Sequence, residues 1–348
     1  MRCRTRLRFV ASCVALLLLG SAVGAADALR ISDPVVHANL AIYLVRGAAA
    51  GGAVPLSLEE ALAGGRVKVR ETGSVNELTV ENIGTSEVFI QAGDIVKGGR
   101  QDRVLSVDLL LPPRSGQVSI AAFCVESGRW TARGQEDSRQ FSSAAAAMPS
   151  HEGKLAIRAF MASDAPAKTI APASLDTAAR QSEIWATVRK TQDHLARSVG
   201  APVAAPASPS SLQLSLESEK LKEAQAAYIG ALQKAGDSGD DVIGYVVAIN
   251  GKISGADLYG SPVLFHKLWR KQLAASVTEA ISEKDAAGAA PPSVKDVESF
   301  LAQAESGRES ERLLNAGVHL ATRDSGGSLY AETRRAAGGW VHRNYLAK

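Results

Sequence analysis

Three groups of polar residues have the types and spacing that chemistry could use, and the densest lies between residues 92 and 103. Its glycines leave backbone amides accessible, and its cations suit a phosphate or a carboxylate. It is not a P-loop, because Gly99 and Arg100 stand where that motif needs Lys and Ser or Thr. We interpret it either as an anion-binding loop or as a tight hairpin whose cations pair with Asp94, Gln101 and Asp102. The candidate ligand-binding residues here are Gly93, Asp94, Lys97, Gly98, Arg100, Gln101 and Arg103.

The second group is the run Cys124-Val-Glu-Ser-Gly-Arg-Trp130, at the end of an expected strand. Glu126 could orient a sugar hydroxyl or act as a general base, and Arg129 could hold an anion. Trp130 could stack on a ring. The structural alternative is that Glu126 pairs with Arg129 while Trp130 covers the edge of a sheet.

The third group spans residues 244–260, where turn chemistry already explains Asn250 and the glycines. Asp257 and Tyr259 remain, and Asp257 joins the candidate ligand-binding residues. The sequence contains no paired-carboxylate motif, no Ser/His/Asp arrangement and no His-x-x-x-His spacing. We therefore assign no catalytic residue and no metal ligand, and the cofactor stays unknown.

The chain begins with a segment typical of a secretory signal peptide. Four arginines precede an apolar run over residues 9–19, and small residues follow at 22–26. We expect cleavage near Ala25 or Ala26 and a periplasmic or secreted protein that does not stay in the membrane. Removing the leader's four arginines from the 39 basic residues leaves 35, against 36 acidic ones. A nearly neutral mature chain argues against broad nucleic-acid binding.

Cys124 is the only cysteine of the expected mature chain, so no intrachain disulfide can form. It could be a thiolate nucleophile paired with a histidine, or a small buried apolar residue. We favour the buried residue, because no nucleophile signature surrounds Cys124. The possible histidine partners are His37, His151, His194, His266, His319 and His342.

Short runs of alternating apolar residues fill the N-terminal half, from Leu40 to Val125, with turns between most of them. They predict an antiparallel β-rich sandwich or partial barrel. Ser57 to Glu60 fits a capping box and predicts a short helix.

Helices and hairpins alternate in the C-terminal half. We expect helices over about 175–199 and 216–235, a hairpin turning at Asn250-Gly251, and a helix after Ser261-Pro262. A helix from Ser293 and a hairpin over 318–333 complete the α+β fold.

The domain organisation is predicted as a signal peptide over 1–26, one domain over 27–335 and a C-terminal tail over 336–348. Two low-complexity insertions interrupt the domain. The first, 131–173, is expected to be a long surface excursion, and the second, 201–211, an extended, solvated Pro/Ala/Ser loop.

The order of these motifs resembles the domain family associated with ADP-ribosylglycohydrolases and the rhodanese-phosphatase superfamily. The similarity covers roughly Leu29 to Tyr330. The resemblance implies a single α+β domain, and the family's association with ADP-ribose-handling enzymes is contextual. The residues that carry it are Leu-Thr-Val-Glu-Asn82, the segment 92–103, Leu-Pro-Pro113, the run 124–130, Gln181 with Trp185, and Gly-Lys-Ile-Ser-Gly-Ala-Asp-Leu-Tyr259.

Three functions remain open. We favour an exported, non-catalytic module that binds an anionic small molecule, of ADP-ribose or nucleotide type, and it requires the segments 93–103 and 126–130 to meet in one pocket. The alternatives are a hydrolase that uses Glu126, Asp94 or Asp257, and a purely structural or protein-binding domain.

Overall fold

The computed structural model describes residues 29–129, 140–162, 176–237, 239–284, 288–315 and 317–348. The predicted signal peptide lies outside these residues and stays a prediction. Within the described part of the chain, none of the helices has the length and apolarity needed to cross a membrane.

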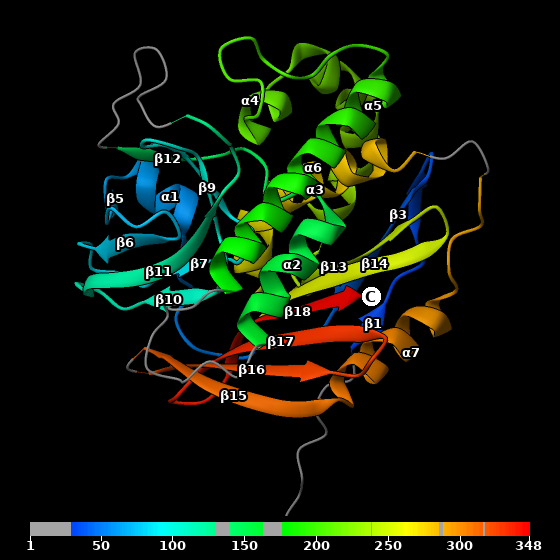
Figure 1. The fold of residues 1–348 in the computed structure, drawn as a ribbon. Coiled ribbons are helices and arrows are strands. Elements are labelled where there is room, and N and C mark those ends of the chain that lie inside the picture. Colours follow the sequence, from blue (N-terminus) through cyan, green and yellow to red (C-terminus); the bar gives the residue numbers. More distant parts are fainter. Residues whose placement is uncertain (1–28, 130–139, 163–175, 238, 285–287, 316) are drawn as a thin grey trace, which may run out of the picture.

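A nine-stranded antiparallel sheet forms the centre of the molecule (Figure 1). Its strands follow the order β1-β3-β13-β14-β18-β17-β16-β15, and β2 pairs with β3. The sheet therefore joins the beginning of the domain to its end. The strands are β1 (Arg30–Ile31), β2 (Val35–His37), β3 (Leu40–Arg46), β13 (Val242–Ile249), β14 (Lys252–Tyr259), β15 (Arg308–Asn315), β16 (Val318–Asp324), β17 (Ser328–Arg335) and β18 (Trp340–Ala347).

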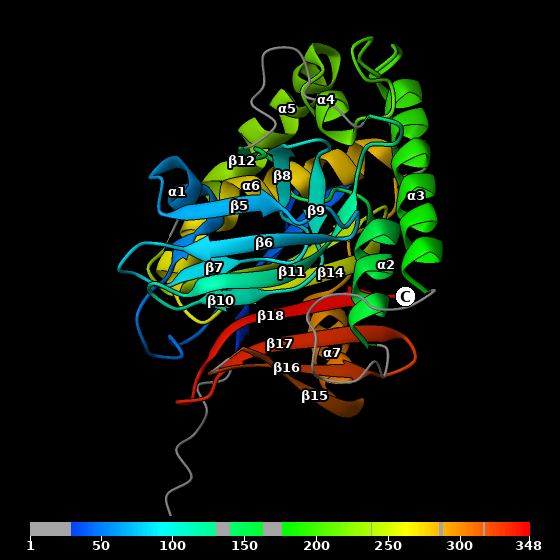
Figure 2. The ribbon, with the colours of Figure 1, turned by 60° about the vertical axis from the view of Figure 1, so that its left-hand side comes forward.

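Two smaller sheets hold the rest of the N-terminal half and stand beside the large sheet (Figure 2). One has the order β10-β7-β4 and contains one parallel pair, β4 with β7. The other has the order β12-β8-β9-β11-β6-β5. Their strands are β4 (Leu56–Ser57), β5 (Val67–Glu71), β6 (Glu77–Asn82), β7 (Val88–Ile90), β8 (Ile95–Gly98), β9 (Arg103–Leu105), β10 (Leu109–Leu111), β11 (Gly116–Cys124) and β12 (Phe141–Ser143).

The helices cover both faces of the large sheet and create two hydrophobic cores. Helix α6 lies on one face, where α3 and α5 cover it in turn, and α7 lies on the other face. Because α6 has neighbours on nearly every side, even its Lys271 and Glu279 are buried. The helices are α1 (Leu58–Ala63), α2 (His151–Ala162), α3 (Asp176–Val199), α4 (Leu212–Leu216), α5 (Glu219–Gly236), α6 (Pro262–Ser282) and α7 (Val294–Glu305).

The local signals in the sequence are confirmed. Ser57 and Glu60 form the predicted capping box of α1. Asn250 and Gly251, with φ of 50° and 74°, turn the hairpin between β13 and β14. Ser261 caps α6, whose first residue is the predicted proline. The fold is α+β with a β-rich N-terminal half, as expected.

Three predictions, about the two insertions and the C-terminal tail, are wrong. The 131–173 segment contains β12 and α2 and is not simply a surface excursion. The 201–211 segment is not solvated throughout, because Ser208 and Ser211 are buried against the core. The expected tail over 336–348 supplies β18, which pairs with β14 and β17 inside the large sheet. In the first two segments, small and polar residues are buried by contacts with distant parts of the chain, and in the third a strand with apolar residues at both ends pairs with strands that lie elsewhere in the sequence.

Candidate functional site

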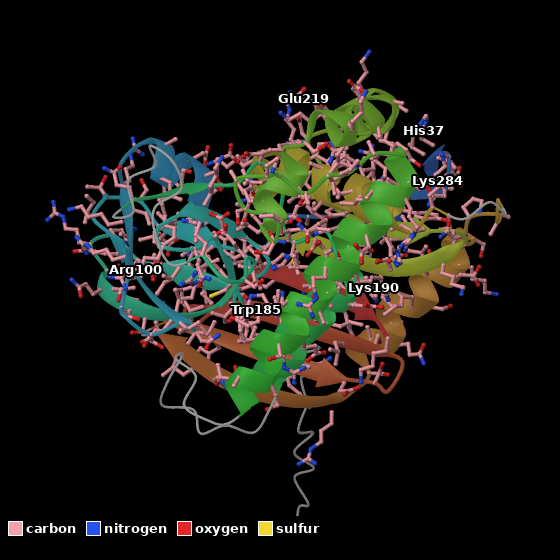
Figure 3. All side chains as sticks on the ribbon, turned by 45° about the horizontal axis from the view of Figure 1, so that its top comes forward. His37, Arg100, Trp185, Lys190, Glu219 and Lys284 are labelled. Atoms are coloured by element: carbon pink, nitrogen blue, oxygen red, sulfur yellow. The ribbon has the colours of Figure 1, made fainter. Side chains whose placement is uncertain are left out.

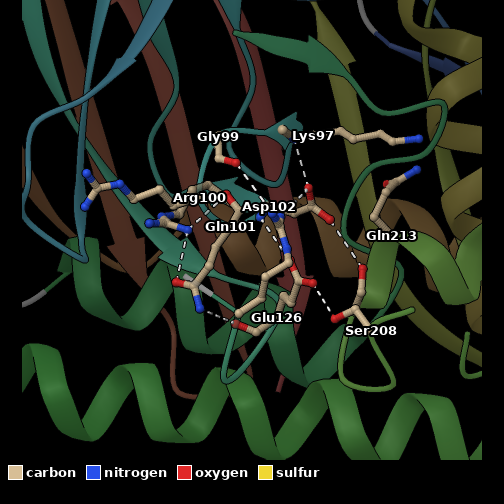
Figure 4. Close-up of polar contacts among 12 residues, drawn as sticks. Lys97, Gly99, Arg100, Gln101, Asp102, Glu126, Ser208 and Gln213 are labelled. Carbon is tan, nitrogen blue, oxygen red and sulfur yellow. Dashed lines mark hydrogen bonds and ion pairs between the residues drawn. The ribbon is translucent and has the colours of Figure 1, made fainter. Parts of the chain in front are cut away.

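The two segments predicted to meet do meet. Backbone turns after β8 and after β11 bring residues 99–103 beside residues 126–129 (Figure 4). Gln101 Nε2 donates to the carbonyl oxygen of Glu126 at 3.2 Å, and Arg129 Nε donates to Glu126 Oε2 at 2.8 Å. Arg129 Nη2 lies 3.7 Å from Asp102 Oδ1. The two segments therefore contact each other, whereas the binding hypothesis also requires a shared pocket and includes Trp130, which lies outside the described residues.

This cluster is closed, however. Asp102 and Glu126 are fully buried, and only 1% of Arg103 is exposed. Ser208 and Ser211, from the 201–211 segment, cover the cluster and donate to Glu126 and Asp102. Its positive and negative side chains compensate one another, which favours the structural interpretation of the Glu126–Arg129 pair.

Close packing explains the glycines at the end of β8. Gly98 has φ of 125°, and a Cβ atom there would lie 2.4 Å from the carbonyl oxygen of Gln140. A Cβ atom on Gly99 would lie 2.3 Å from the ring of Phe141. The approach of β12 requires these glycines, and this requirement is independent of any ligand.

The other residues predicted around these segments are dispersed. Lys97 Nζ pairs with Glu217 at 2.6 Å. Arg100 is exposed beside the strands of the N-terminal half (Figure 3). Asp94 is buried with Lys271 of α6, whose Nζ lies 2.6 Å from its Oδ1. Trp130 lies outside the described residues.

Cys124 is fully buried, and burial raises the pKa of its thiol to about 11. The thiol donates to Gln101 Oε1 at 3.0 Å. A thiol with so high a pKa is protonated at neutral pH and is a poor nucleophile. The prediction of a small buried residue is confirmed.

Asp257 belongs to a second buried polar network, between the small sheets and the large sheet. His342, at the pairing of β18 with β14, lies between two carboxylates. Its Nδ1 is 2.7 Å from Asp108 Oδ2, and its Nε2 is 2.9 Å from Asp257 Oδ1. Tyr245 and Asn344 donate to Asp257, each at 2.8 Å.

Electrostatic interactions within this network keep His342 and Asp108 charged. Burial alone would lower the pKa of His342, but Asp108 and Asp257 raise it to about 9. Burial alone would raise the pKa of Asp108, yet Arg158 and His342 hold it well below its usual range. His342 is therefore an imidazolium at neutral pH that ties β18 to Asp108, and both of its nitrogens have carboxylate partners.

Arg158 of α2 extends this network to a cavity. Its Nε donates to Asn344 Oδ1 at 3.0 Å, and its Nη2 lies 3.4 Å from Asp108 Oδ1. Its Nη1 is buried and has no hydrogen-bond partner among the described residues. Arg158 and Asn344 line a cavity of about 210 Å³ beneath α2, on the face of β15 to β17. The other described residues that line it are Arg308, Ser310, Thr322, Arg323, Asp324, Leu329, Tyr330 and Ala331.

Arg158, Arg308 and Arg323 are not predictable as site residues from the sequence, because they are isolated charges in segments expected to be a surface excursion or ordinary helix and hairpin. No local motif marks them. Among the described residues, no group of three or more His, Cys, Asp and Glu side chains is arranged to hold a metal ion.

The comparison with protein families matches residues 28–346 to the ARG and Rhodanese-Phosphatase-superfamily-associated Protein domain. The chain therefore belongs to this family, as its motifs indicated. Neither the comparison with curated proteins nor that with solved structures found a match.

Proposed function

We propose that this protein binds a small anionic molecule in the cavity beneath α2. The observation that carries the proposal is the buried Nη1 of Arg158, which has no hydrogen-bond partner in the part of the chain that the structure describes and belongs to a side chain lining the cavity. A buried donor without an acceptor costs free energy, and an anionic ligand would supply the acceptor. The proposal keeps the predicted anion binding and moves it away from the closed cluster around Glu126.

Charge supports an anionic ligand. The described lining residues include three arginines and one acidic residue, Asp324, whose carboxylate already pairs with Lys348. The guanidinium of Arg323 is held by Glu309 and by the carbonyl oxygen of Glu305 at the end of α7, so Arg158 and Arg308 are the arginines that an anion beneath α2 would meet. Arg308 is exposed. Arginine binds phosphate and carboxylate through paired N–H groups, so both kinds of anion fit.

The volume of the cavity limits which ligands can fit. A cavity of about 210 Å³ is smaller than the roughly 300–1,000 Å³ of most drug-sized ligand sites. It suits a sugar phosphate or a small dicarboxylate, or one phosphate end of a larger nucleotide-like ligand.

Calorimetric titration of the purified protein with inorganic phosphate, ribose 5-phosphate, malonate and ADP-ribose tests this function. Arg158→Gln is expected to weaken binding roughly 10- to 100-fold, the value of a charge-assisted hydrogen bond. Arg308→Ala removes an exposed cation from the lining and is expected to weaken binding several-fold. Arg270→Ala, an exposed arginine on α6, is the matched control and should leave affinity unchanged.

Binding of none of these anions would refute the proposal. Equal affinity in the wild type, Arg158→Gln and Arg308→Ala would refute the assigned site. We further propose that the protein acts outside the cytoplasm, because the predicted leader is typical of exported proteins. The intact mass of the protein recovered from its native cells tests this: export is expected to remove about 25 residues.

A further inference from the structure

A β-bulge places Ser254 outside the regular alternation of β14. Val247 pairs with Gly255 and Ala248 pairs with Ile253, so Ser254 has no opposite residue on β13. Such an extra residue turns a side chain to the other face of a sheet. Ala256 and Leu258 pack in the core on the α7 side, whereas the Ser254 hydroxyl contacts α2 and α6.

Two bases flank this hydroxyl. Ser254 Oγ donates to Glu279 Oε1 at 2.5 Å and lies 3.1 Å from His151 Nδ1, so the hydroxyl proton has to turn from Glu279 to His151 before His151 can accept it. The other oxygen of Glu279 pairs with Lys154 Nζ at 2.7 Å. Ser254 and His151 are half-buried, so the serine is screened from bulk water without being sealed. A serine with a base in hydrogen-bond reach is the arrangement that nucleophilic catalysis uses.

His151 is suited to accept a proton. Burial lowers its pKa, and the charge of Glu279 offsets this only in part. The imidazole is therefore neutral at pH 7. With its proton on Nε2, the neutral ring directs the Nδ1 lone pair at Ser254 Oγ, 3.1 Å away.

We propose that Ser254 is a nucleophile that hydrolyses a small carboxylic ester, with His151 as its general base. This activity goes beyond the proposed anion binding and uses different residues. Ser254 Oγ bonds to the ester carbon, the bond from that carbon to the alcohol oxygen breaks, and the serine proton passes through His151 to the alcohol. Water then attacks the acyl-serine, releases the carboxylic acid and returns the proton to Ser254.

The adjoining cavity indicates the kind of ester. Glu279 lines a second cavity of about 210 Å³, together with Glu152, Glu283 and Lys190, the last labelled on α3 in Figure 3. Burial and the negative charge of Glu279 raise the pKa of Glu283. Two of these carboxylates already pair with lysines, Glu152 with Lys190 and Glu279 with Lys154, so Glu283 is the acidic group that would attract a positively charged substrate. We therefore assign an ester that carries an ammonium group.

Covalent labelling tests the nucleophile. A fluorophosphonate reacts with an activated serine, forming a bond from phosphorus to Oγ and expelling fluoride. The full chain is treated with the probe, and the labelled residue is mapped by mass spectrometry. We expect labelling at Ser254, its loss in Ser254→Ala, and a rate roughly 100-fold lower in His151→Gln. Ser299→Ala, an exposed serine on α7, is the matched control and should label like the wild type.

No label at Ser254 would overturn the proposal, and so would equal labelling rates in the wild type and His151→Gln. Because the mapping uses the wild-type protein, this result does not depend on the folding of a variant. Arg158→Gln is expected to keep the labelling, which separates this activity from anion binding.

The substrate class has its own test. The 4-nitrophenyl esters of trimethylammonioacetic acid and of 3,3-dimethylbutanoic acid have nearly the same shape and differ in charge. For each ester, kcat/KM is divided by the rate of the uncatalysed hydrolysis. We expect this ratio to be about tenfold higher for the cationic ester, and we expect Glu283→Gln to reduce the difference. An equal ratio for the two esters would overturn the assignment of an ammonium group.

Discussion

The imidazolium bridge of His342 predicts a specific loss of stability in mild alkali. The histidine is fully buried between Asp108 and Asp257, which raise its pKa to about 9. In the unfolded chain its pKa is close to the ordinary 6.5. The folded state therefore holds this proton more tightly than the unfolded state. Its contribution to stability is complete below pH 6.5 and disappears as the pH rises to 9.

The size of the effect follows from the shift in pKa. Each pKa unit corresponds to about 1.4 kcal/mol, so the shift predicts a loss of about 3 kcal/mol in the free energy of unfolding between pH 6.5 and pH 9. Free energies of unfolding are typically about 5–15 kcal/mol, so this loss is measurable.

Urea unfolding at pH 6.0, 7.5 and 9.0 measures the loss. His342→Gln is expected to be less stable at pH 6.0 and to lose most of the decline between pH 6.0 and 9.0. His319→Gln, on the neighbouring surface of β16, is the matched control and should decline like the wild type. An equal decline in His342→Gln and the wild type would refute the reasoning, because the proton would then come from another group.

Two further changes test the closed cluster and its glycines. Glu126→Gln is expected to lower the free energy of unfolding in urea by about 3 kcal/mol, because it leaves a buried guanidinium without its carboxylate. Glu223→Gln, on the exposed face of α5, should change the stability little. A similar loss of stability in both variants would contradict this. Gly98→Ala is expected to cost more than about 2 kcal/mol, because its Cβ would meet the Gln140 carbonyl. Gly128 also has a positive φ, but a Cβ atom there would enter open space, so Gly128→Ala should lower the free energy of unfolding by about 1 kcal/mol. A larger loss in Gly128→Ala than in Gly98→Ala would show that β12 does not constrain Gly98.

The features predictable from sequence depend on residues that are close in the chain. The Ser57 capping box, the Asn250-Gly251 turn and the Ser261-Pro262 helix start each involve neighbours within a few positions. Their backbone geometry follows from local hydrogen bonding and from allowed φ and ψ angles. The convergence of Glu126 with the 99–103 segment was also predicted, but whether the cluster is open or closed depended on the distant 201–211 segment.

Residues far apart in the chain create the sites that the sequence did not reveal. Asp108 and His342 are 234 positions apart, and no spacing rule connects them. The orientation of Ser254 depends on a register shift against β13, which its own strand sequence does not specify.

By itself, the sequence determined the family, the α+β class and most of the helix starts and turns, because short-range interactions encode them. Tertiary structure alone decided that the end of the chain is a strand within the large sheet, that the Glu126 cluster is closed, and that Arg158 keeps a buried donor at a cavity. Burial and charge compensation come from all neighbours in space, and most of those neighbours are distant in sequence.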